Sequence, residues 1–213
     1  MSYQYLICDR QDEIATITLN RPDKKNALST PLRDEIIACF DALASERTRA
    51  IIITGAGETF CAGFDLAEFT TGDPAAIFAH ATAYHHKVYN SPVPTIAAVN
   101  GAAYAGGLDL AAMCDLRIAV TTARFAQPQV RMGIPAAFEL MKTVFPEPVA
   151  RQLCLTGEPL TASQALGAGF LNQVCEADQL MSRATELATA VAAAKGSTAM
   201  RAKIVSAQQN LFE

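Results

Sequence analysis

Residues 94–115 of the chain read PTIAAVNGAAYAGGLDLAAMCD. The uncharged run at residues 95–99 predicts a buried β-strand, which leads into a loop with several glycines. A short helix is expected next, from about residue 106 to residue 113. The same order of strand, glycine-rich loop and short helix occurs at residues 50–69. The sequence therefore loosely repeats one strand–loop–helix unit.

The segments on either side continue this alternation of strands and helices, which is typical of an α/β protein. The predicted elements are a hairpin of residues 3–8 and 14–19, a helix from Pro31 with Thr30 as its N-cap, strands at 50–54 and 116–120, a helix at 74–90, helices at 135–145, 147–155 and 161–168, an extended segment at 170–174, and helices at 178–195 and 198–211. No linker interrupts the series, so we expect one domain, residues 1–213, with a helical C-terminal region.

The composition argues against several classes of protein. The 213 residues are 51% hydrophobic and 18% charged, which rules out disorder. A net charge of −4 disfavours a nucleic-acid-binding protein, and no uncharged run has the composition of a membrane span. The six cysteines form no CxxC pair, so we expect reduced thiols and no zinc site. The N-terminal residues show no signal-peptide pattern, so we expect a cytoplasmic protein.

The two glycine-rich loops admit more than one interpretation. A loop between a strand and a helix can direct backbone N–H groups at an anion. Residues 55–60, GAGETF, begin like the dinucleotide-binding pattern GxGxxG but end in Phe60, which disfavours an NAD-dependent oxidoreductase. The remaining functional interpretation is an oxyanion hole assembled from both loops. The structural alternative is that the glycines only form tight turns.

Several segments together resemble one known family. They are Arg21-Pro22 with Asn26-Ala27-Leu28, Thr54-Gly55-Ala56-Gly57 with Phe60-Cys61-Ala62-Gly63-Phe64-Asp65-Leu66, residues 94–115, and the later LTGEPLTASQALGAGFLNQV. In this order they resemble the patterns of the crotonase superfamily, the enoyl-CoA hydratases and isomerases. The resemblance spans about residues 5–205 and implies a crotonase-like ββα spiral. It places the spiral core at about residues 1–175 and C-terminal helices, shorter than usual for the family, at about 176–213.

The resemblance also implies an oxyanion hole, a coenzyme A site and a substrate. The backbone N–H groups of Phe64 and Gly106 are the implied donors to a thioester carbonyl that becomes enolate-like during reaction. Coenzyme A is implied as part of the acyl-CoA thioester substrate, with no permanently bound cofactor and no metal. The implied coenzyme A-binding residues are Lys24, Lys25, Ala27, Ala62, Asp65 and Leu66. The family further implies assembly as a homotrimer or a dimer of trimers.

The implied acid–base residues depart from the family pattern. Hydratases of the family use two glutamates, and the matching positions here are Asp109 and Gln129. The aspartate carboxylate lies about 1.5 Å further back than that of a glutamate, and a glutamine orients a water without exchanging a proton. At Asp109 the helix start favours the ionised form and a desolvated pocket opposes it. Glu139, on a later helix, either enters the pocket or lies on a solvated face.

We therefore expect an acyl-CoA-processing enzyme with Asp109 as its acid–base group. Hydration or double-bond isomerisation of an enoyl-CoA is the leading reaction, with decarboxylation as a competitor. The alternative is a CoA-thioester-binding protein with weak or no catalysis, because Gln129 replaces the second glutamate. Among His80, His85 and His86, at most one of the adjacent pair faces a given pocket, since neighbouring helix residues point in different directions.

Overall fold

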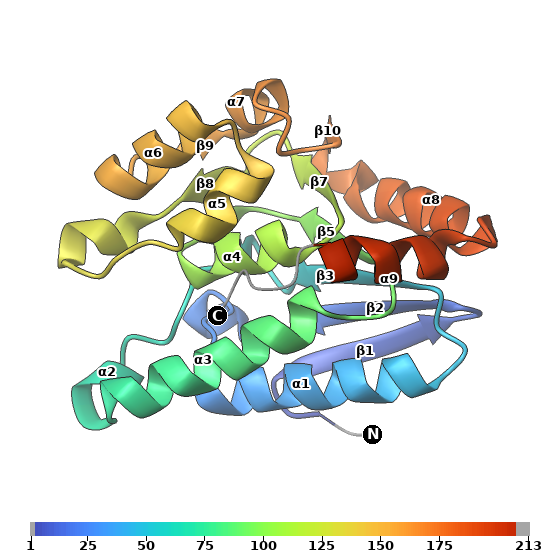
Figure 1. Ribbon diagram of the computed structural model, residues 1–213, viewed down its shortest axis with the longest axis horizontal. Helices are drawn as coiled ribbons and strands as arrows, with labels where there is room; N and C mark the ends of the chain where they lie inside the picture. Colours follow the sequence, from blue (N-terminus) through green and yellow to red (C-terminus); the bar gives the residue numbers. More distant parts are fainter. Residues whose placement is uncertain (1–2, 208–213) are drawn as a thin grey trace.

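Two β-sheets form the frame of the protein in a computed structural model, which describes residues 3–207 (Figure 1). The larger sheet has the strand order β1-β2-β3-β5-β7-β10 and is parallel from β2 onward. The smaller sheet has the order β4-β6-β8-β9. The strands are β1 Leu6–Gln11, β2 Ile14–Leu19, β3 Ala50–Gly55, β4 Thr59–Cys61, β5 Thr95–Val99, β6 Ala102–Tyr104, β7 Leu116–Val120, β8 Arg124–Ala126, β9 Leu160–Thr161 and β10 Gln173–Cys175.

Helices pack against the sheets and against one another. They are α1 Thr30–Ser45, α2 Glu68–Thr71, α3 Pro74–Tyr89, α4 Gly106–Met113, α5 Phe138–Val144, α6 Glu147–Thr156, α7 Ala162–Gly167, α8 Leu180–Ala193 and α9 Ser197–Ala207, with 3₁₀ turns at Pro22–Lys24, Pro128–Met132 and Ala177–Gln179. Helix α8 lies across β3, β5 and β7, and α1 runs beside α3 (Figure 1). Within residues 3–207 no helix combines the length and the apolar composition that crossing a membrane requires.

From β3 to β8 the chain repeats a unit of two strands and a helical segment, and each unit adds one strand to each sheet. The pairs are β3 with β4, β5 with β6, and β7 with β8. A helical segment follows every pair: α2 and α3 after β4, α4 after β6, and α5 and α6 after β8. This arrangement is the α/β ββα spiral expected from the sequence, and the C-terminal region is helical as predicted.

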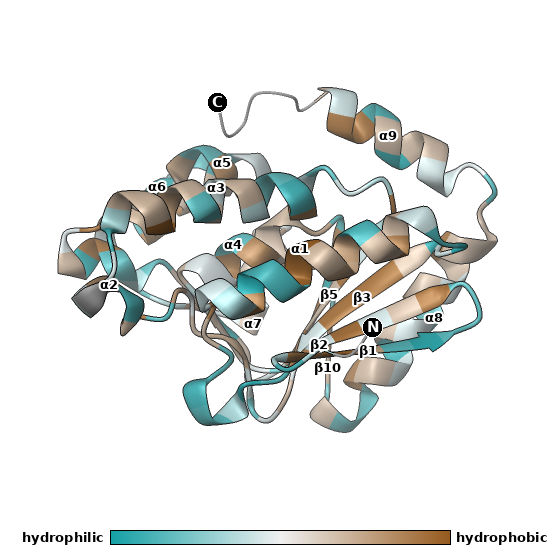
Figure 2. Cartoon of the chain, turned by 90° about the horizontal axis from the view of Figure 1, so that it is seen from below, coloured by the Kyte–Doolittle hydropathy of each residue, from teal (hydrophilic) through white to brown (hydrophobic). Residues whose placement is uncertain are grey.

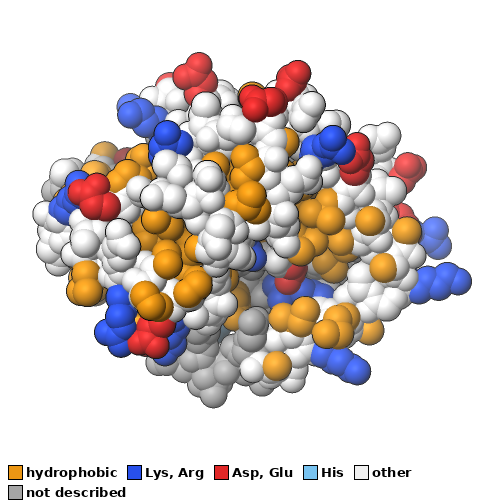
Figure 3. Space-filling model, turned by 90° about the horizontal axis from the view of Figure 1, so that it is seen from above, with side chains coloured by type: hydrophobic (Ala, Val, Ile, Leu, Met, Phe, Trp, Pro, Cys, Tyr) orange, Lys and Arg blue, Asp and Glu red, His pale blue; other side chains and the backbone are white. Residues whose placement is uncertain are grey.

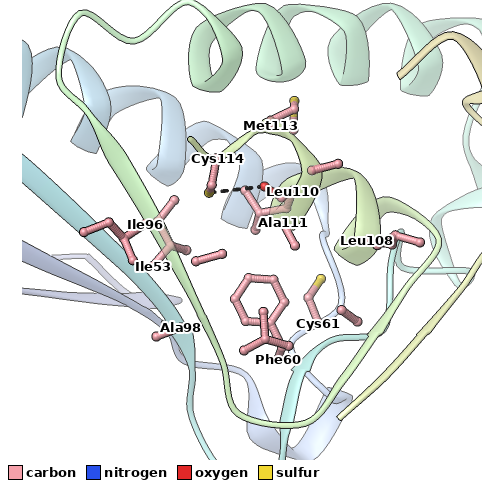
Figure 4. Close-up of a cluster of buried hydrophobic side chains, with 14 of the residues drawn as sticks. Ile53, Phe60, Cys61, Ile96, Ala98, Leu108, Leu110, Ala111, Met113 and Cys114 are labelled. Atoms are coloured by element: carbon pink, nitrogen blue, oxygen red, sulfur yellow. Dashed lines mark hydrogen bonds between the residues drawn. The ribbon is translucent and has the colours of Figure 1, made fainter. Parts of the chain in front are cut away.

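The strands in the middle of the larger sheet are buried on both faces. Every residue of β3 and β5 is buried, as is typical of a parallel sheet covered on both sides. Side chains from β3, β4, β5 and α4 gather around the Phe60 ring (Figure 4). All of α4 is buried, so the start of this helix is held inside the core rather than on the surface.

Helix α1 shows the amphipathic pattern that a covering helix requires. Leu32, Ile36, Phe40 and Leu43 are buried, and they follow one another at helical spacing. Figure 2 shows hydrophobic residues concentrated in β3 and a mixture of hydrophilic and hydrophobic residues on α1. The apolar side of α1 therefore covers the core while its polar side faces solvent.

Two asparagine side chains hold the first glycine loop, residues 55–57, in place. Asn26 Nδ2 donates to two backbone oxygens of this region at 2.9 and 2.7 Å. From the other side, Asn100 Nδ2 donates to the backbone oxygens of Gly55 and Gly57 at 2.9 and 2.8 Å. The two asparagine-bearing segments, far apart in the sequence, therefore converge on one turn.

The buried elements are predicted more accurately than the rest. The strands at 95–99 and 116–120 and the helix at 106–113 are confirmed at both ends. The prediction of Thr30 as an N-cap is wrong, because α1 begins at Thr30 and its N-cap is Ser29. The Thr30 N–H instead donates to the Glu68 Oε1 at 2.5 Å, so a distant carboxylate caps the helix.

Other element boundaries differ from the predicted ones, and the smaller sheet was not predicted. The helix expected at 135–145 begins at Phe138, after a 3₁₀ turn and a short extended stretch. The helix expected at 198–211 is α9 as far as Ala207, and residues 208–213 lie outside the described part. Strands β4, β6 and β8 were not predicted, because three residues are too few to show an alternating pattern.

Apolar side chains also reach the surface. Figure 3 shows groups of hydrophobic side chains on the face that is uppermost in Figure 1, with charged side chains mainly around its edge. Leu155 of α6 is 75% exposed. The six cysteines are free thiols, and all but Cys8 are buried.

Ala105, the N-cap residue of α4, is strained. Its φ of 49° and ψ of −124° form a conformation that residues with a β-carbon rarely adopt. Such strain costs about 1–3 kcal/mol, whereas glycine adopts positive φ readily. We expect Ala105→Gly to raise the free energy of unfolding by about 1 kcal/mol and the midpoint of thermal unfolding by about 2–4 °C. Differential scanning calorimetry checks this, and a lower midpoint would contradict it.

Candidate active site

A cavity of about 520 Å³ lies between the loop of residues 62–66, the start of α4, helix α3 and the segment before α5. Its wall is mostly apolar. The large apolar side chains in the wall are Phe64, Leu66, Phe69, Phe78, Met132 and Ile134. The polar groups are few, with Thr82, His85, Asp109 and Gln129 as the polar side chains. A mostly apolar cavity with a few convergent polar groups is the usual form of a small-molecule site.

Two backbone N–H groups are available at this wall. Within residues 3–207, the N–H groups of Phe64 and Gly106 donate no hydrogen bond to the chain. Gly106 is the first residue of α4, where N–H groups lack an intrahelical acceptor. A β-carbon built at Gly63 would lie 3.2 Å from the Gly106 nitrogen, so the two loops are in contact. The structure therefore brings both predicted donor residues to the same cavity.

Asp109 carries its carboxyl group into this cavity from the first turns of α4, with 4% of the residue exposed. Burial raises the pKa of Asp109 to about 7, although a hydrogen bond from Gln127 acts in the opposite direction. Desolvation thus outweighs the hydrogen bond from Gln127. Near neutral pH the carboxyl group populates both protonation states, as suits a group that accepts and returns a proton.

Two glutamine side chains form a hydrogen-bonded chain that ends at Asp109. Gln127 Nε2 donates to Asp109 Oδ1 at 2.8 Å, and Gln129 Nε2 donates to Gln127 Oε1 at 2.6 Å. Gln127 is fully buried, whereas Gln129 lines the cavity. The Gln129 Oε1 is buried and has no partner among the described residues.

Gln127→Leu is expected to move the pH dependence of any reaction that uses Asp109. The substitution removes the hydrogen bond that lowers the pKa of Asp109, so this pKa rises above about 7. It also leaves the Gln129 amide without its acceptor, which costs about 1–3 kcal/mol of stability. A pH–rate profile measures the shift and thermal unfolding measures the loss. A profile that coincides with that of the unchanged chain would exclude the role given to Gln127.

The remaining predicted coenzyme A-binding residues fall into two groups. Those that line the cavity are Ala27, Ala62 and Leu66. Lys24 and Lys25 are exposed, and Asp65 forms an ion pair with Arg21 at 3.0 Å. None of these three predicted residues belongs to the cavity wall.

Glu139 lies on the outer side of α5. Its side chain is 63% exposed and forms an ion pair with Lys142. The helix turns the next two residues, Leu140 and Met141, into the core, so Glu139 faces solvent. The prediction that Glu139 enters the pocket is therefore wrong, and its solvated alternative is confirmed. Among the described residues, Asp109 is the one carboxylate in the cavity wall.

Two residues near Asp109 had no assigned role from the sequence, namely His85 and Gln127. His85 lines the cavity, and burial lowers its pKa to about 4, so the imidazole is neutral at pH 7. The cavity wall formed by α3 consists of residues at helical spacing, namely Phe78, Ala81, Thr82 and His85. This spacing is the sequence pattern that could have indicated that His85 faces the cavity. Gln127 gives no comparable local signal, because its partner Asp109 comes from a separate segment.

The family of the chain follows from comparison with known proteins. The family model for enoyl-CoA hydratase/isomerase matches residues 9–211. The chain belongs to the enoyl-CoA hydratase/isomerase family. This is a family of enzymes that act on coenzyme A thioesters, and its crotonase fold is the spiral described above.

Named members of the family are similar over most of the chain. A probable enoyl-CoA hydratase from Mycobacterium bovis is 35% identical over 210 residues, which cover 95% of this chain and 81% of the relative. The short-chain-enoyl-CoA hydratase of Clostridium acetobutylicum is 33% identical, with coverage of 90% and 76%. The crystal structure of an enoyl-CoA hydratase/isomerase from Xanthobacter autotrophicus Py2 has a TM-score of 0.91 at 30% identity and covers 97% of this chain and 80% of its own.

Proposed function

We propose that the chain processes an acyl-CoA thioester by stabilising an enolate with the N–H groups of Phe64 and Gly106, and that Asp109 moves the protons. One observation carries this proposal. A buried carboxyl group with a pKa of about 7 shares a cavity with two backbone donors that the chain itself leaves unused. Preorganised donors of this kind stabilise developing negative charge on an oxygen, and each is worth roughly 3–4 kcal/mol in a transition state.

Double-bond isomerisation needs only one such carboxyl group. The Asp109 carboxylate takes a proton from C2 of a 3-enoyl thioester, and the electron pair of the broken C–H bond forms a dienolate. The negative oxygen of the dienolate accepts the hydrogen bonds of the two backbone N–H groups. Protonated Asp109 then returns the proton to C4, which leaves the double bond between C2 and C3. The pKa of about 7 suits both transfers.

Hydration is the second reaction that the site supports. A water would add to C3 of a 2-enoyl thioester while C2 gains a proton. The Gln129 Oε1, which has no partner among the described residues, would accept a hydrogen bond from that water. Gln129 takes up no proton, so Asp109 would have to accept the proton of the water and supply the proton to C2. We therefore propose that isomerisation is faster than hydration in this chain.

A coenzyme A-binding protein without turnover is the other candidate. It is favoured by Gln129 at the position of the second hydratase glutamate and by a cavity wall that contains one carboxylate among the described residues. In both proposals the coenzyme A part of the ligand contacts Ala27, Ala62 and Leu66, and its phosphates lie near the exposed Lys24 and Lys25.

The test is turnover of a small panel of thioesters by purified protein, followed by mass spectrometry and ultraviolet absorbance. The panel contains 2-enoyl, 3-enoyl, 3-hydroxyacyl and malonyl-type coenzyme A thioesters. Conversion of the 3-enoyl member to its conjugated isomer supports isomerisation, and a gain of 18 mass units by the 2-enoyl member supports hydration. Binding of every thioester without any product would favour the non-catalytic candidate.

A further inference from the structure

Arg33 of α1 is a charged side chain with no exposure to solvent. Its Nη1 donates to the Leu28 carbonyl oxygen at 2.5 Å and lies 3.3 Å from Glu68 Oε2. Its Nη2 donates to Thr30 Oγ1 at 2.8 Å, and its Nε donates to His80 Nδ1 at 3.0 Å. All three guanidinium nitrogens are thus engaged, which is the condition for burying a charge without a large penalty.

The Arg33 side chain reaches the loop that carries one of the two proposed donors. The guanidinium carbon lies 5.1 Å from the centre of the Phe64 ring. The Leu28 backbone, whose oxygen Arg33 binds, donates its N–H to the Gly63 oxygen at 2.8 Å. A β-carbon built at Gly106 would lie 3.0 Å from the Phe64 ring, so the ring fills the space between Arg33 and the start of α4. Arg33 therefore supports the loop that carries Phe64 in two ways. It binds the Leu28 backbone, which is hydrogen-bonded to Gly63, and it lies against the Phe64 ring.

The charge of Arg33 is matched by Glu68, and Asp34 adds a second carboxylate behind His80. Its carboxylate partner, Glu68, is 20% exposed and also binds the Thr30 N–H group. His80 lies between Arg33 and Asp34, because its Nδ1 is 3.0 Å from Arg33 Nε and its Nε2 is 2.8 Å from Asp34 Oδ1.

We propose that Arg33 is a positioning residue of the oxyanion hole. It fixes the Gly63–Phe64 segment so that the Phe64 N–H points into the cavity. This inference rests on the function proposed above. It adds to that function a side chain that supports the backbone donor of Phe64 from behind. This side chain comes from α1 and not from the two loops that carry the donors.

The test compares four variants by the absorbance of a bound conjugated thioester, cinnamoyl-CoA. Polarisation of its carbonyl by an oxyanion hole moves the absorbance to longer wavelength, independently of turnover. We expect Arg33→Met to lose most of this shift and ~10–100-fold in kcat, below the ~10²–10³-fold that loss of one donor costs. We expect Arg33→Lys, which keeps the charge but not the fork of donors, to recover part of both.

Arg117→Met is the matched control. Arg117 is a partly buried arginine that lies 4.9 Å from the centre of a phenylalanine ring, that of Phe170, and binds backbone oxygens. It contacts the far end of α4, at Cys114, and not the cavity wall. We expect this variant to unfold at lower temperature while the absorbance shift of bound cinnamoyl-CoA stays unchanged.

Glu68→Gln separates a positioning role from a merely structural one. The amide still accepts a hydrogen bond but removes the negative charge beside Arg33. The proposal predicts an absorbance shift at least as large as in the unchanged chain, whereas a simple structural ion pair predicts a smaller one. An Arg33→Met protein that binds cinnamoyl-CoA with the full shift and full kcat would overturn the inference. If the unchanged chain binds the probe without any shift, the oxyanion hole itself is wrong and the inference falls with it.

Discussion

Asp109→Asn is expected to lower the turnover of an enoyl-CoA thioester by about 10²–10⁴-fold, the usual contribution of a general acid–base group. The amide has nearly the shape of the carboxylate and can keep the 2.8 Å hydrogen bond from Gln127, but it exchanges no proton. The apolar wall and the two backbone donors are untouched, so thioester affinity is expected to stay within about threefold. The loss therefore falls on kcat and not on KM.

The measurement is the initial rate on the best member of the thioester panel, together with equilibrium binding of the same thioester. Asp41→Asn is the matched control, because it makes the same chemical change at an exposed aspartate on α1 that pairs with Lys87. We expect the control to retain full kcat. Equal rates in Asp109→Asn and the unchanged chain would remove Asp109 from the mechanism.

The same substitution is expected to stabilise the protein above neutral pH. Burial raises the pKa of Asp109 from 3.8 to about 7, so between these values the folded chain holds a proton that the unfolded chain has released. Stability therefore falls as the pH rises from about 4 to about 7, and the cost is complete above that range. Asp109→Asn removes the titrating group, and we expect a gain of about 4 kcal/mol at pH 8 that disappears near pH 4.

Thermal unfolding at several pH values checks this prediction. A gain of about 4 kcal/mol corresponds to a rise of about 10 °C in the midpoint for a chain of this size. The exposed control Asp41→Asn is expected to show no comparable pH-dependent difference. If Asp109→Asn is less stable than the unchanged chain at pH 8, the carboxylate is better solvated in the folded protein than its burial indicates.

The fold could be predicted where residues act over a short range. The apolar runs of β3 and β5 and the glycine-to-helix start of α4 have local signals in composition and spacing. The N-cap of α1 could not be predicted, because the carboxylate that binds Thr30 comes from Glu68, far along the chain. Strands β4, β6 and β8 exist because a neighbouring strand pairs with them, and three residues carry no pattern of their own.

In the candidate site, too, features with a local sequence pattern were predicted and features that depend on distant residues were not. The loops that carry Phe64, Gly106 and Asp109 were predicted, and the structure brings these residues to one cavity. The protonation of Asp109 could not be predicted, because it depends on how deeply α4 is buried. Nor could the fully buried Arg33 be distinguished from an ordinary surface residue, because its partners come from three separate segments.

The two N–H groups at the cavity wall belong to the main chain, and this has an evolutionary consequence. A side-chain donor is lost by a single codon change, whereas the N–H of Phe64 or Gly106 survives almost any replacement that keeps the turn. Residues 109 and 129, by contrast, each change their chemistry with one substitution. A lineage built on this scaffold can therefore change the residues at 109 and 129 while both main-chain N–H groups are kept.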